Sequence, residues 1–203
     1  MDIYLIRHGE KEDSRNHESV KLTEKGFRQA ELTGMLLESH GIERIYSSNM
    51  LRAIQTSEAI NRYINTEIEV VPELREIHMG ICETEGWDSL EKKYPEYMKE
   101  FNRHESDMRY PPDGECGRDA WERAKGFLES LVTTGYKRVA LITHGGVIKV
   151  ILAGILGLEQ QKRFYFGSPL KNCSISIIKY DYCCRTFSIH CYNNYSHIDS
   201  VYK

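Results

Sequence analysis

Two short runs of apolar residues, one near each end of the chain, are followed by similar polar motifs. Ile3-Tyr4-Leu5-Ile6 precedes Arg7-His8-Gly9, and Val139-Ala140-Leu141-Ile142 precedes Thr143-His144-Gly145-Gly146. Continuous apolar runs of this length, bounded by glycine, are typical of buried strands. In an open α/β sheet, the loops that leave the carboxyl ends of parallel strands build the ligand site. The two histidines are therefore predicted to share one pocket.

The rest of the chain alternates between helical and strand patterns. Thr23 can cap a helix that runs to about residue 39, and Gly41 follows where that helix is expected to end. The same periodicities predict helices over residues 51–64, 88–102, 118–132 and 147–156, and strands over 42–46 and 68–71. The tail alternates apolar and polar residues over 174–177 and 186–190, which indicates an antiparallel hairpin.

Strands that alternate with helices predict a sheet covered by helices on both faces. The expected fold class is α/β. It is a three-layer α/β/α sandwich, with a mostly parallel central sheet and an antiparallel pair at one edge. The chain has 203 residues, within the usual size of one domain, so residues 1–203 are predicted to form a single domain.

Composition excludes several classes of function. The net charge of −3 argues against a nucleic-acid partner, because domains that bind nucleic acid are usually strongly basic. No apolar stretch approaches the ~18 residues of a membrane span, and no signal peptide precedes the first strand. The six cysteines form neither a CxxC pair nor a small disulfide framework. Reduced thiols, a cytoplasmic location and no membrane partner are expected.

The tail holds a group of residue types that bind zinc: Cys183, Cys184, His190, Cys191 and His197. Their spacing matches no standard zinc finger, and alternate residues of a strand point to opposite faces of a sheet. No metal site is predicted there.

An anion site needs more groups than two histidines, and the sequence supplies them. Arg52 lies just past the second predicted strand, where it can turn toward Arg7. Two guanidinium groups can bind a phosphoryl group bidentately from different directions. His144 and the N-terminus of the helix near Val147 can add further donors. Glu76 lies after the third strand and offers a carboxyl group that can protonate a leaving oxygen.

Five motifs, in this order and at these separations, resemble the histidine phosphatase superfamily in its phosphoglycerate-mutase-like branch, branch 1. They are Arg7-His8-Gly9-Glu10, Ser47-Ser48 with Arg52-Ala53 and Thr56, Leu74-Arg75-Glu76 with Gly80, Gly114-Glu115, and Thr143-His144-Gly145-Gly146. The resemblance covers roughly residues 1–160. One motif alone would be weak, whereas the ordered set is specific.

The resemblance implies a two-step phosphoryl transfer with no metal ion or cofactor. His8 would attack phosphorus and become phosphohistidine, and water would then release phosphate. Arg7, Arg52 and His144 would hold the phosphoryl oxygens and neutralise the charge of the transition state. Glu76 would protonate the leaving alcohol and then activate the water.

The chemistry of the residues agrees with these roles. His8 must be neutral to attack, and the two nearby arginines should lower its pKa by like-charge repulsion. Its other ring nitrogen needs an acceptor, expected to be a backbone carbonyl. Glu76 must be protonated when phosphate enters, and the bound anion should raise its pKa. The activity optimum is therefore expected to be more acidic than alkaline.

Three further residues are candidates for binding the phosphate: Gly9, Gly145 and Asn16. Glycines at these positions can also simply permit tight turns. Many relatives carry a Trp-Asn pair after the first motif, and this chain has a different sequence there, so Asn16 replaces that asparagine only as a candidate. Lys11 in the same loop could favour substrates with extra negative charge.

Two residues are expected to support the site. Ser48 lies near the start of a predicted helix, where capping is the alternative role. Glu115 lies just before a helix and could interact with its dipole. The resemblance instead implies that Glu115 lies on the Arg52 side of the pocket.

The segment at about 81–113 is the predicted lid or cap over the substrate. Its candidate rim residues are Trp87, Tyr94, Tyr97, Arg103, His104, Arg109 and Tyr110. The segment is short beside the insert of the cofactor-dependent mutases, which favours hydrolysis. The expected function is a phosphomonoester hydrolase acting through phosphohistidine on a small phosphorylated metabolite, and a homodimer is compatible with the sequence.

Alternatives remain open. Within the class they are an α-ribazole-phosphate phosphatase specifically, or a phosphoglycerate mutase-type phosphotransferase. In a different class, the chain would be a non-catalytic sensor of a phosphate ligand. The intact set of His8, Arg52, Glu76 and His144 argues against a sensor, because a sensor would be free to lose the nucleophile or the acid.

Overall fold

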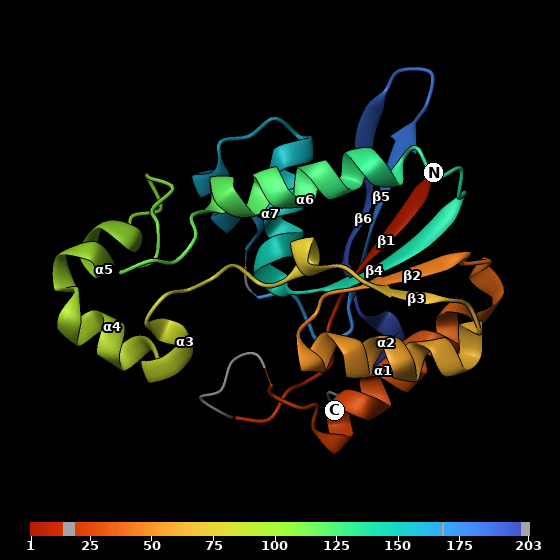
Figure 1. The fold of residues 1–203 in the computed structure, drawn as a ribbon, viewed down its shortest axis with the longest axis horizontal. Helices are drawn as coiled ribbons and strands as arrows, with labels where there is room; N and C mark the ends of the chain where they lie inside the picture. The colour runs from red at the N-terminus through yellow and green to blue at the C-terminus, as the bar shows by residue number, and fades with distance from the viewer. Residues whose placement is uncertain (14–18, 168, 200–203) are drawn as a thin grey trace.

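Among the described residues, six strands form one sheet in the order β3-β2-β4-β1-β5-β6 (Figure 1). The computed structural model describes residues 1–13, 19–167 and 169–199. The strands are β1 (Asp2–Arg7), β2 (Arg44–Ser47), β3 (Ile68–Val70), β4 (Arg138–Thr143), β5 (Ile175–Asp181) and β6 (Thr186–Asn194). β3, β2, β4 and β1 are parallel, whereas β5 is antiparallel to β1 and β6 to β5. The predicted sheet, with an antiparallel pair at one edge, is confirmed.

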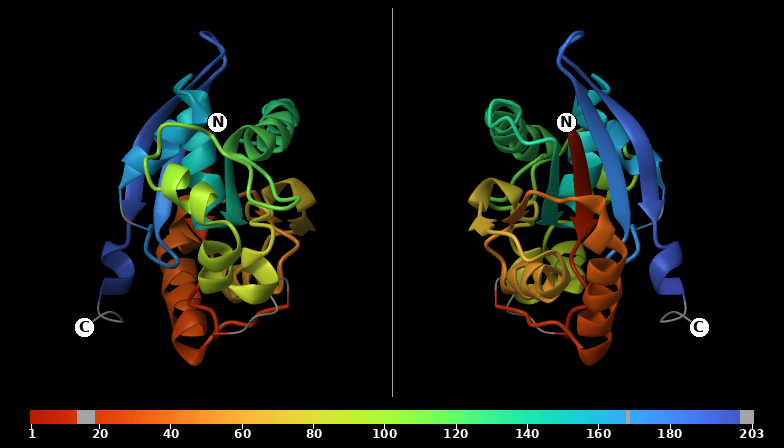
Figure 2. Two further views of the ribbon diagram at one scale, coloured as in Figure 1. Left: turned by 90° about the vertical axis from the view of Figure 1, so that its left-hand side faces the viewer. Right: turned by 90° about the vertical axis from the view of Figure 1, so that its right-hand side faces the viewer.

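Two pairs of helices cover the two faces of the sheet, which gives the predicted three layers (Figures 1 and 2). α1 (Glu24–Leu37) and α2 (Leu51–Ile64) lie on one face, and α6 (Gly117–Leu131) and α7 (Gly145–Ile155) lie on the other. Short 3₁₀ helices complete the connections: η1 (Glu38–His40), η2 (Pro72–Leu74), η3 (Gln160–Phe166) and η4 (Ser196–Ile198).

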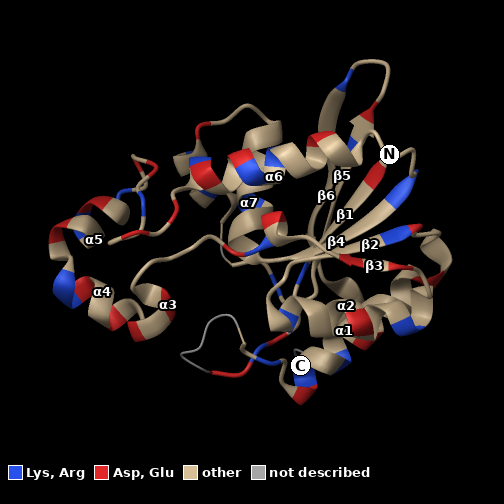
Figure 3. Cartoon of the chain, in the orientation of Figure 1, with Lys and Arg blue, Asp and Glu red and all other residues tan. Residues whose placement is uncertain are grey.

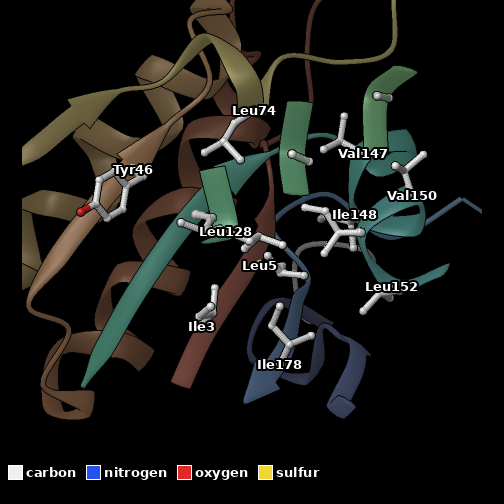
Figure 4. Packing of buried hydrophobic residues seen from close by; sticks show 14 of the residues in the cluster. Ile3, Leu5, Tyr46, Leu74, Leu128, Val147, Ile148, Val150, Leu152 and Ile178 are labelled. Carbon is white, nitrogen blue, oxygen red and sulfur yellow. The ribbon is translucent and has the colours of Figure 1, made fainter. Parts of the chain in front are cut away.

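The central strands supply both halves of the core, because successive side chains of a strand point to opposite faces. Tyr4 and Ile6 belong to the core cluster with α1 and α2, whereas Ile3 and Leu5 belong to the cluster with α6 and α7. Figure 4 shows Leu5 close to Leu128 in the second cluster. Full burial of one such side chain contributes roughly 1.5–3 kcal/mol. Burial on both faces explains the continuous apolar run of β1.

Local sequence signals set the ends of the helices. The N–H of Gly26 donates to Thr23 Oγ1 over 3.0 Å, so Thr23 caps α1 as predicted. Gly41 has φ of 64° and ends the turn that follows α1. α7 begins at Gly145, ahead of the predicted start at Val147, because the extended His144 is its N-cap. This places the start of α7 directly beside the histidine.

The predicted lid contains three short helices that lie away from the sheet (Figure 1). They are α3 (Cys82–Glu85), α4 (Trp87–Lys93) and α5 (Pro95–Phe101). The prediction of one helix over residues 88–102 is wrong, since the helix is divided at Pro95. Proline has no N–H and its ring clashes with the preceding turn, so it is tolerated only in the first turn of a helix.

The two ends of the lid segment are joined by backbone contacts. The N–H of Ile81 donates to Pro111 O over 3.0 Å, and the N–H of Glu115 donates to His78 O over 2.8 Å. Gly80 has φ of 54°, and a Cβ there would lie 2.2 Å from Pro111 O. Only glycine fits this close approach. The two backbone segments that connect the predicted lid to the rest of the domain therefore lie side by side.

Charged residues of both signs are spread over the helices that flank the sheet, whereas the middles of the central strands carry none (Figure 3). This distribution matches a core between two helical layers. None of the helices within the described residues is long and apolar enough to cross a membrane.

Candidate active site

The two histidines lie side by side at the carboxyl ends of neighbouring strands. β1 and β4 pair in parallel with Arg7 opposite Thr143, and the N–H of His8 donates to Thr143 O over 2.9 Å. The ring centroids of His8 and His144 are 5.1 Å apart. The sheet thus unites two motifs that are far apart in the sequence. We call Arg7, His8, Arg52, Glu76 and His144 the phosphoryl site.

His8 is held in one tautomer. Its Nδ1 lies 2.7 Å from Gly9 O, and a carbonyl oxygen can only accept, so Nδ1 carries the proton. Nε2 then has a lone pair, and the Nε–H of Arg52 donates to it over 3.2 Å. The carbonyl acceptor agrees with the prediction from sequence. The Nε2 lone pair is therefore directed at the Arg52 guanidinium.

His8 is also kept neutral. Burial lowers its pKa well below the usual value, and Arg52 and then Arg7 lower it further. The direction agrees with the prediction, but burial contributes more than the arginines, because the ring is only 4% exposed. A buried, uncharged imidazole with a directed lone pair can act as a nucleophile.

Arg52 is the charged centre of the site. It lies in the first turn of α2 and is 1% exposed. Burial lowers the pKa of its guanidinium, an effect that Glu76 and Glu83 partly offset. A buried cation beside a neutral imidazole favours an anion within reach of both groups. Glu83 was not among the residues predicted from sequence.

Ser48 contacts the second histidine. His144 Nε2 lies 2.8 Å from Ser48 Oγ, and the N–H of Met50 donates to the same oxygen over 3.3 Å. Ser48 therefore orients His144 and also satisfies a backbone group just before α2. Ser48 is not the N-cap of α2, which is Met50 without a side-chain cap, so its contact with His144 agrees with the supporting role.

Glu76 lies at the N-terminus of α7. Its carboxylate accepts hydrogen bonds from the N–H groups of Gly146 and Val147, each over 3.2 Å, and from the N–H of Ile77 over 3.0 Å. A Cβ at residue 146 would lie 2.5 Å from Glu76 Oε1, so a side chain there would displace the carboxylate. The expectation that this helix end binds phosphate needs correction. Its first N–H groups bind Glu76 and fix the carboxylate beside the site.

Glu115 is placed differently from the expectation. Its carboxylate accepts two hydrogen bonds from Arg123, over 2.9 and 3.0 Å, and one from the N–H of His78 over 2.9 Å. These contacts outweigh burial and lower the pKa of Glu115. Arg123 also donates to the carbonyl of Glu76 over 3.2 Å. Glu115 supports the segment that carries Glu76, rather than the Arg52 side of the pocket. No sequence pattern pointed to Arg123.

The smaller candidates have separate outcomes. The N–H of Gly9 donates to Thr56 Oγ1 over 3.0 Å, and a Cβ on Gly9 would lie 2.5 Å from Gly26 O. Gly9 therefore serves close packing, and its role in phosphate binding stays a prediction. At Gly145 a Cβ would lie 3.5 Å from Arg7 Nε, an ordinary contact. Asn16 lies outside the described residues.

Lys11 lies near the positive groups of the site. Burial lowers its pKa, and Arg52 and Arg7 lower it further, while Asp13 acts in the opposite direction. Its ammonium is 3.4 Å from Glu12 O. The structure leaves its contact with substrate a prediction.

A cavity of about 460 Å³ adjoins the phosphoryl site. We call it the apolar pocket, and its lining residues are Arg7, Glu76, Ile77, Met79, Trp87, Phe101, Tyr110, Gly145, Gly146, Lys149, Arg163, Phe164, Pro169 and Leu170. Trp87 and Tyr110 were predicted as rim residues. Phe164, Lys149 and Arg163 were missed. Lys149 follows Gly145 by four positions, which places both on one face of α7, and this spacing could have revealed it.

Other predicted rim residues brace the lid instead. His104 stacks on Phe164, with ring centroids 4.1 Å apart. Arg109 donates to Gly114 O and to Asp119, each over 2.9 Å. The remaining predicted rim residues Tyr94, Tyr97 and Arg103 are not among the residues that line the apolar pocket.

The described residues contain no cluster of metal-binding side chains. Within residues 1–13, 19–167 and 169–199, no group of three or more His, Cys, Asp or Glu could hold a metal ion. Cys183 and Cys184 are free thiols exposed between β5 and β6.

The fold and the arrangement of these residues agree with one family. The model of the histidine phosphatase superfamily (branch 1) matches residues 3–194. The chain belongs to this superfamily and is therefore classed as an enzyme.

Individual relatives show how closely the chain resembles known proteins. The probable phosphoglycerate mutase GpmB of Photorhabdus laumondii is 31% identical over 191 residues, which cover 90% of this chain and 86% of that protein. The structure of YhfR from Bacillus stearothermophilus has a TM-score of 0.85 at 28% identity and covers 97% of this chain and 98% of its own. The α-ribazole phosphatase of Shigella flexneri has a TM-score of 0.82 at 21% identity, over 96% of this chain and 97% of its own. This last likeness shows the fold alone.

Proposed function

We propose that the protein hydrolyses phosphomonoesters of small metabolites through a phosphohistidine at His8, without a metal ion. The observation that carries the proposal is the state of His8. Its Nδ1 proton is bound by Gly9 O, its Nε2 lone pair faces Arg52, and its ring is kept neutral by burial. A histidine with a purely structural role does not require a fixed tautomer, a directed lone pair and a neutral ring next to a buried guanidinium.

In the first step, His8 Nε2 forms a bond to phosphorus while the bond from phosphorus to the alcohol oxygen breaks. Arg7, Arg52 and His144 hold the three remaining phosphoryl oxygens and neutralise the charge that develops on them. Glu76 gives its proton to the leaving oxygen. In phosphorylated His8 the Nδ1–H still donates to Gly9 O, and this hydrogen bond stabilises the positively charged ring.

In the second step, Glu76 takes a proton from a water molecule, whose oxygen attacks phosphorus. The bond from phosphorus to His8 Nε2 breaks, and inorganic phosphate leaves. Glu76 is suited to both steps because hydrogen bonds from Gly146 and Val147 fix its position. The positive charge that a metal ion would supply comes from Arg7 and Arg52, which supports metal independence.

Hydrolysis and transfer to a second alcohol share the first step. The similarity to the probable phosphoglycerate mutase GpmB favours a mutase. A mutase must bind a bisphosphate, whereas the cavity here has mainly apolar walls formed by residues such as Trp87, Phe101 and Phe164. We therefore place hydrolysis first and transfer second. An α-ribazole phosphatase is one specific case of hydrolysis.

The deciding experiment measures hydrolysis of 4-nitrophenyl phosphate with a chelator present. The wild-type protein should hydrolyse it, and His8→Ala should lose several orders of magnitude in kcat/KM, as removal of a nucleophile does. The exposed His190 offers a matched control, since His190→Ala should leave activity unchanged. Brief reaction with ³²P-labelled substrate and alkaline quenching should trap acid-labile label on the wild type only.

Each other result contradicts a stated part of the proposal. Retained activity in His8→Ala would exclude His8 as the nucleophile. Activity abolished by chelator would exclude metal independence. Vanadate binding without hydrolysis of any phosphomonoester would favour the sensor. Label passed to an added phosphoglycerate rather than to water would favour the mutase.

A further inference from the structure

Among the described residues, the apolar pocket is lined by one lysine, which is not part of the phosphoryl site. Lys149 lines the cavity together with Arg7, Glu76 and Gly145. It lies four residues beyond Gly145 in α7, which corresponds to about 6 Å along the helix axis. Both residues therefore lie on the same face of α7 and line the cavity.

The charge of Lys149 has no acidic partner among the residues that the structure describes. Its Nζ donates to Gly167 O, which is a neutral carbonyl. Arg163, which also lines the pocket, has an acidic partner. Its Nη1 lies 2.6 Å from Asp107 Oδ1, so the charge of Arg163 is compensated. Asp107 also accepts from the N–H groups of Gly117 and Arg118. Arg163 thus has a structural role, and Lys149 retains an uncompensated charge.

The residues around Lys149 disfavour its charged form. Burial lowers the pKa of Lys149, and Arg7 lowers it further. Several walls of the same cavity are aromatic or aliphatic, among them Trp87, Phe101 and Phe164. A half-buried cation in such surroundings is stabilised by an anion that enters with it.

The position of the pocket identifies the part of the substrate that fills it. Glu76, which we propose as the proton donor to the leaving oxygen, belongs to the phosphoryl site and also lines the pocket. A group attached to that oxygen must therefore extend past Glu76 into the pocket. Aromatic walls fit a bulky apolar body. A single ammonium is a compact point charge that can pair with one carboxylate.

We infer that Lys149 binds a carboxylate on the leaving group, and that the substrate is a phosphomonoester of a bulky, largely apolar hydroxy acid. This inference rests on the proposed function and names its substrate class. Lys149 would be a residue that determines specificity, outside the bond-making step.

The test uses paired substrates that differ in charge alone. Phenyl phosphates with a carboxylate at the ortho, meta or para position are compared with the matching neutral carboxamides. The wild type should prefer at least one carboxylate by about 10-fold or more in kcat/KM, the range of a charge-assisted hydrogen bond. Lys149→Met should abolish this preference by raising KM for the carboxylate, with little change for the amide. Lys149→Arg should retain most of it, and the exposed Lys125→Met is the control.

Two results would overturn the inference. One is a wild type that hydrolyses both series without preference at any position. The other is a Lys149→Met variant that loses activity equally on carboxylates and amides, which would mean that Lys149 only holds the Gly167 carbonyl. Failure of the proposed function itself is distinguishable, because the wild type would then hydrolyse neither series.

Discussion

The phosphoryl site and the apolar pocket share Arg7 and Glu76 but are built in different ways. In the phosphoryl site His8 and Arg52 are 4% and 1% exposed, and hydrogen bonds from backbone groups or charged neighbours fix each ring and carboxylate. In the pocket Trp87 is 47% exposed, and its neighbours are aromatic rings. One region is defined by directed polar contacts and the other by apolar packing.

This difference separates chemistry from selectivity. Hydrogen bonds and buried charges depend steeply on position, so the phosphoryl site tolerates little change. Apolar walls can be altered in shape at a cost in affinity alone, as long as their volume is kept. Changes at the phosphoryl site should therefore act on kcat, and changes in the pocket should act on KM. Three further predictions test this separation, from the largest expected effect to the smallest.

The largest effect is expected from Glu76→Gln. The amide keeps the size of the side chain but cannot give a proton to an alcohol, so kcat for alkyl phosphates should fall by about 10²–10⁴-fold. With 4-nitrophenyl phosphate, whose leaving group needs no proton, a burst of nitrophenol followed by slow turnover is expected in rapid-mixing kinetics. The exposed Glu73→Gln is the control. An equal loss of burst rate and turnover on both substrates would show that Glu76 only positions α7.

A smaller effect is expected from Gly146→Ala. The added Cβ would lie 2.5 Å from Glu76 Oε1 and would displace the carboxylate, so kcat should fall by roughly 10–100-fold with little change in KM. Gly145→Ala is the matched control on the preceding residue, where the Cβ would make an ordinary contact with Arg7. Steady-state kinetics on both variants decide the matter. Similar losses in the two would contradict a specific role for the Gly146–Glu76 contact.

The smallest effect concerns stability against pH. The pKa of His8 is lowered in the folded protein, so below about pH 6.5 the unfolded chain binds a proton that the folded chain does not. The stability of the wild type should fall with falling pH there, by at most about 1.4 kcal/mol per pH unit from this group. His8→Gln should remove this part of the slope in urea unfolding at pH 5.5, 6.5 and 7.5. His197, whose pKa burial also lowers, is present in both proteins. Identical slopes would mean that the imidazole of His8 is not buried in solution.

Much of the fold could be predicted because its signals are local. The apolar run Ile3-Tyr4-Leu5-Ile6 is buried on both faces, and such runs are recognisable without knowledge of their partners. Thr23 caps α1 through its own neighbour Gly26. Pro95 divides the helix that apolar spacing alone predicts as continuous, because proline lacks an N–H and its ring clashes with the preceding turn.

The sequence by itself determined which groups meet at the strand ends, because parallel strands bring His8 and His144 to one edge of the sheet whatever their separation along the chain. It could not determine which partner each group finds. The tertiary structure decided that Glu76 binds the N–H groups of Gly146 and Val147 and that Glu115 pairs with Arg123. It also decided that Lys149 lines a pocket with no acidic partner among the described residues. The partners of Glu76 and Lys149 lie far from them in the sequence, and Arg123 lies eight residues beyond Glu115. The packing of helices and strands sets the geometry of these contacts, and no short sequence pattern predicts it.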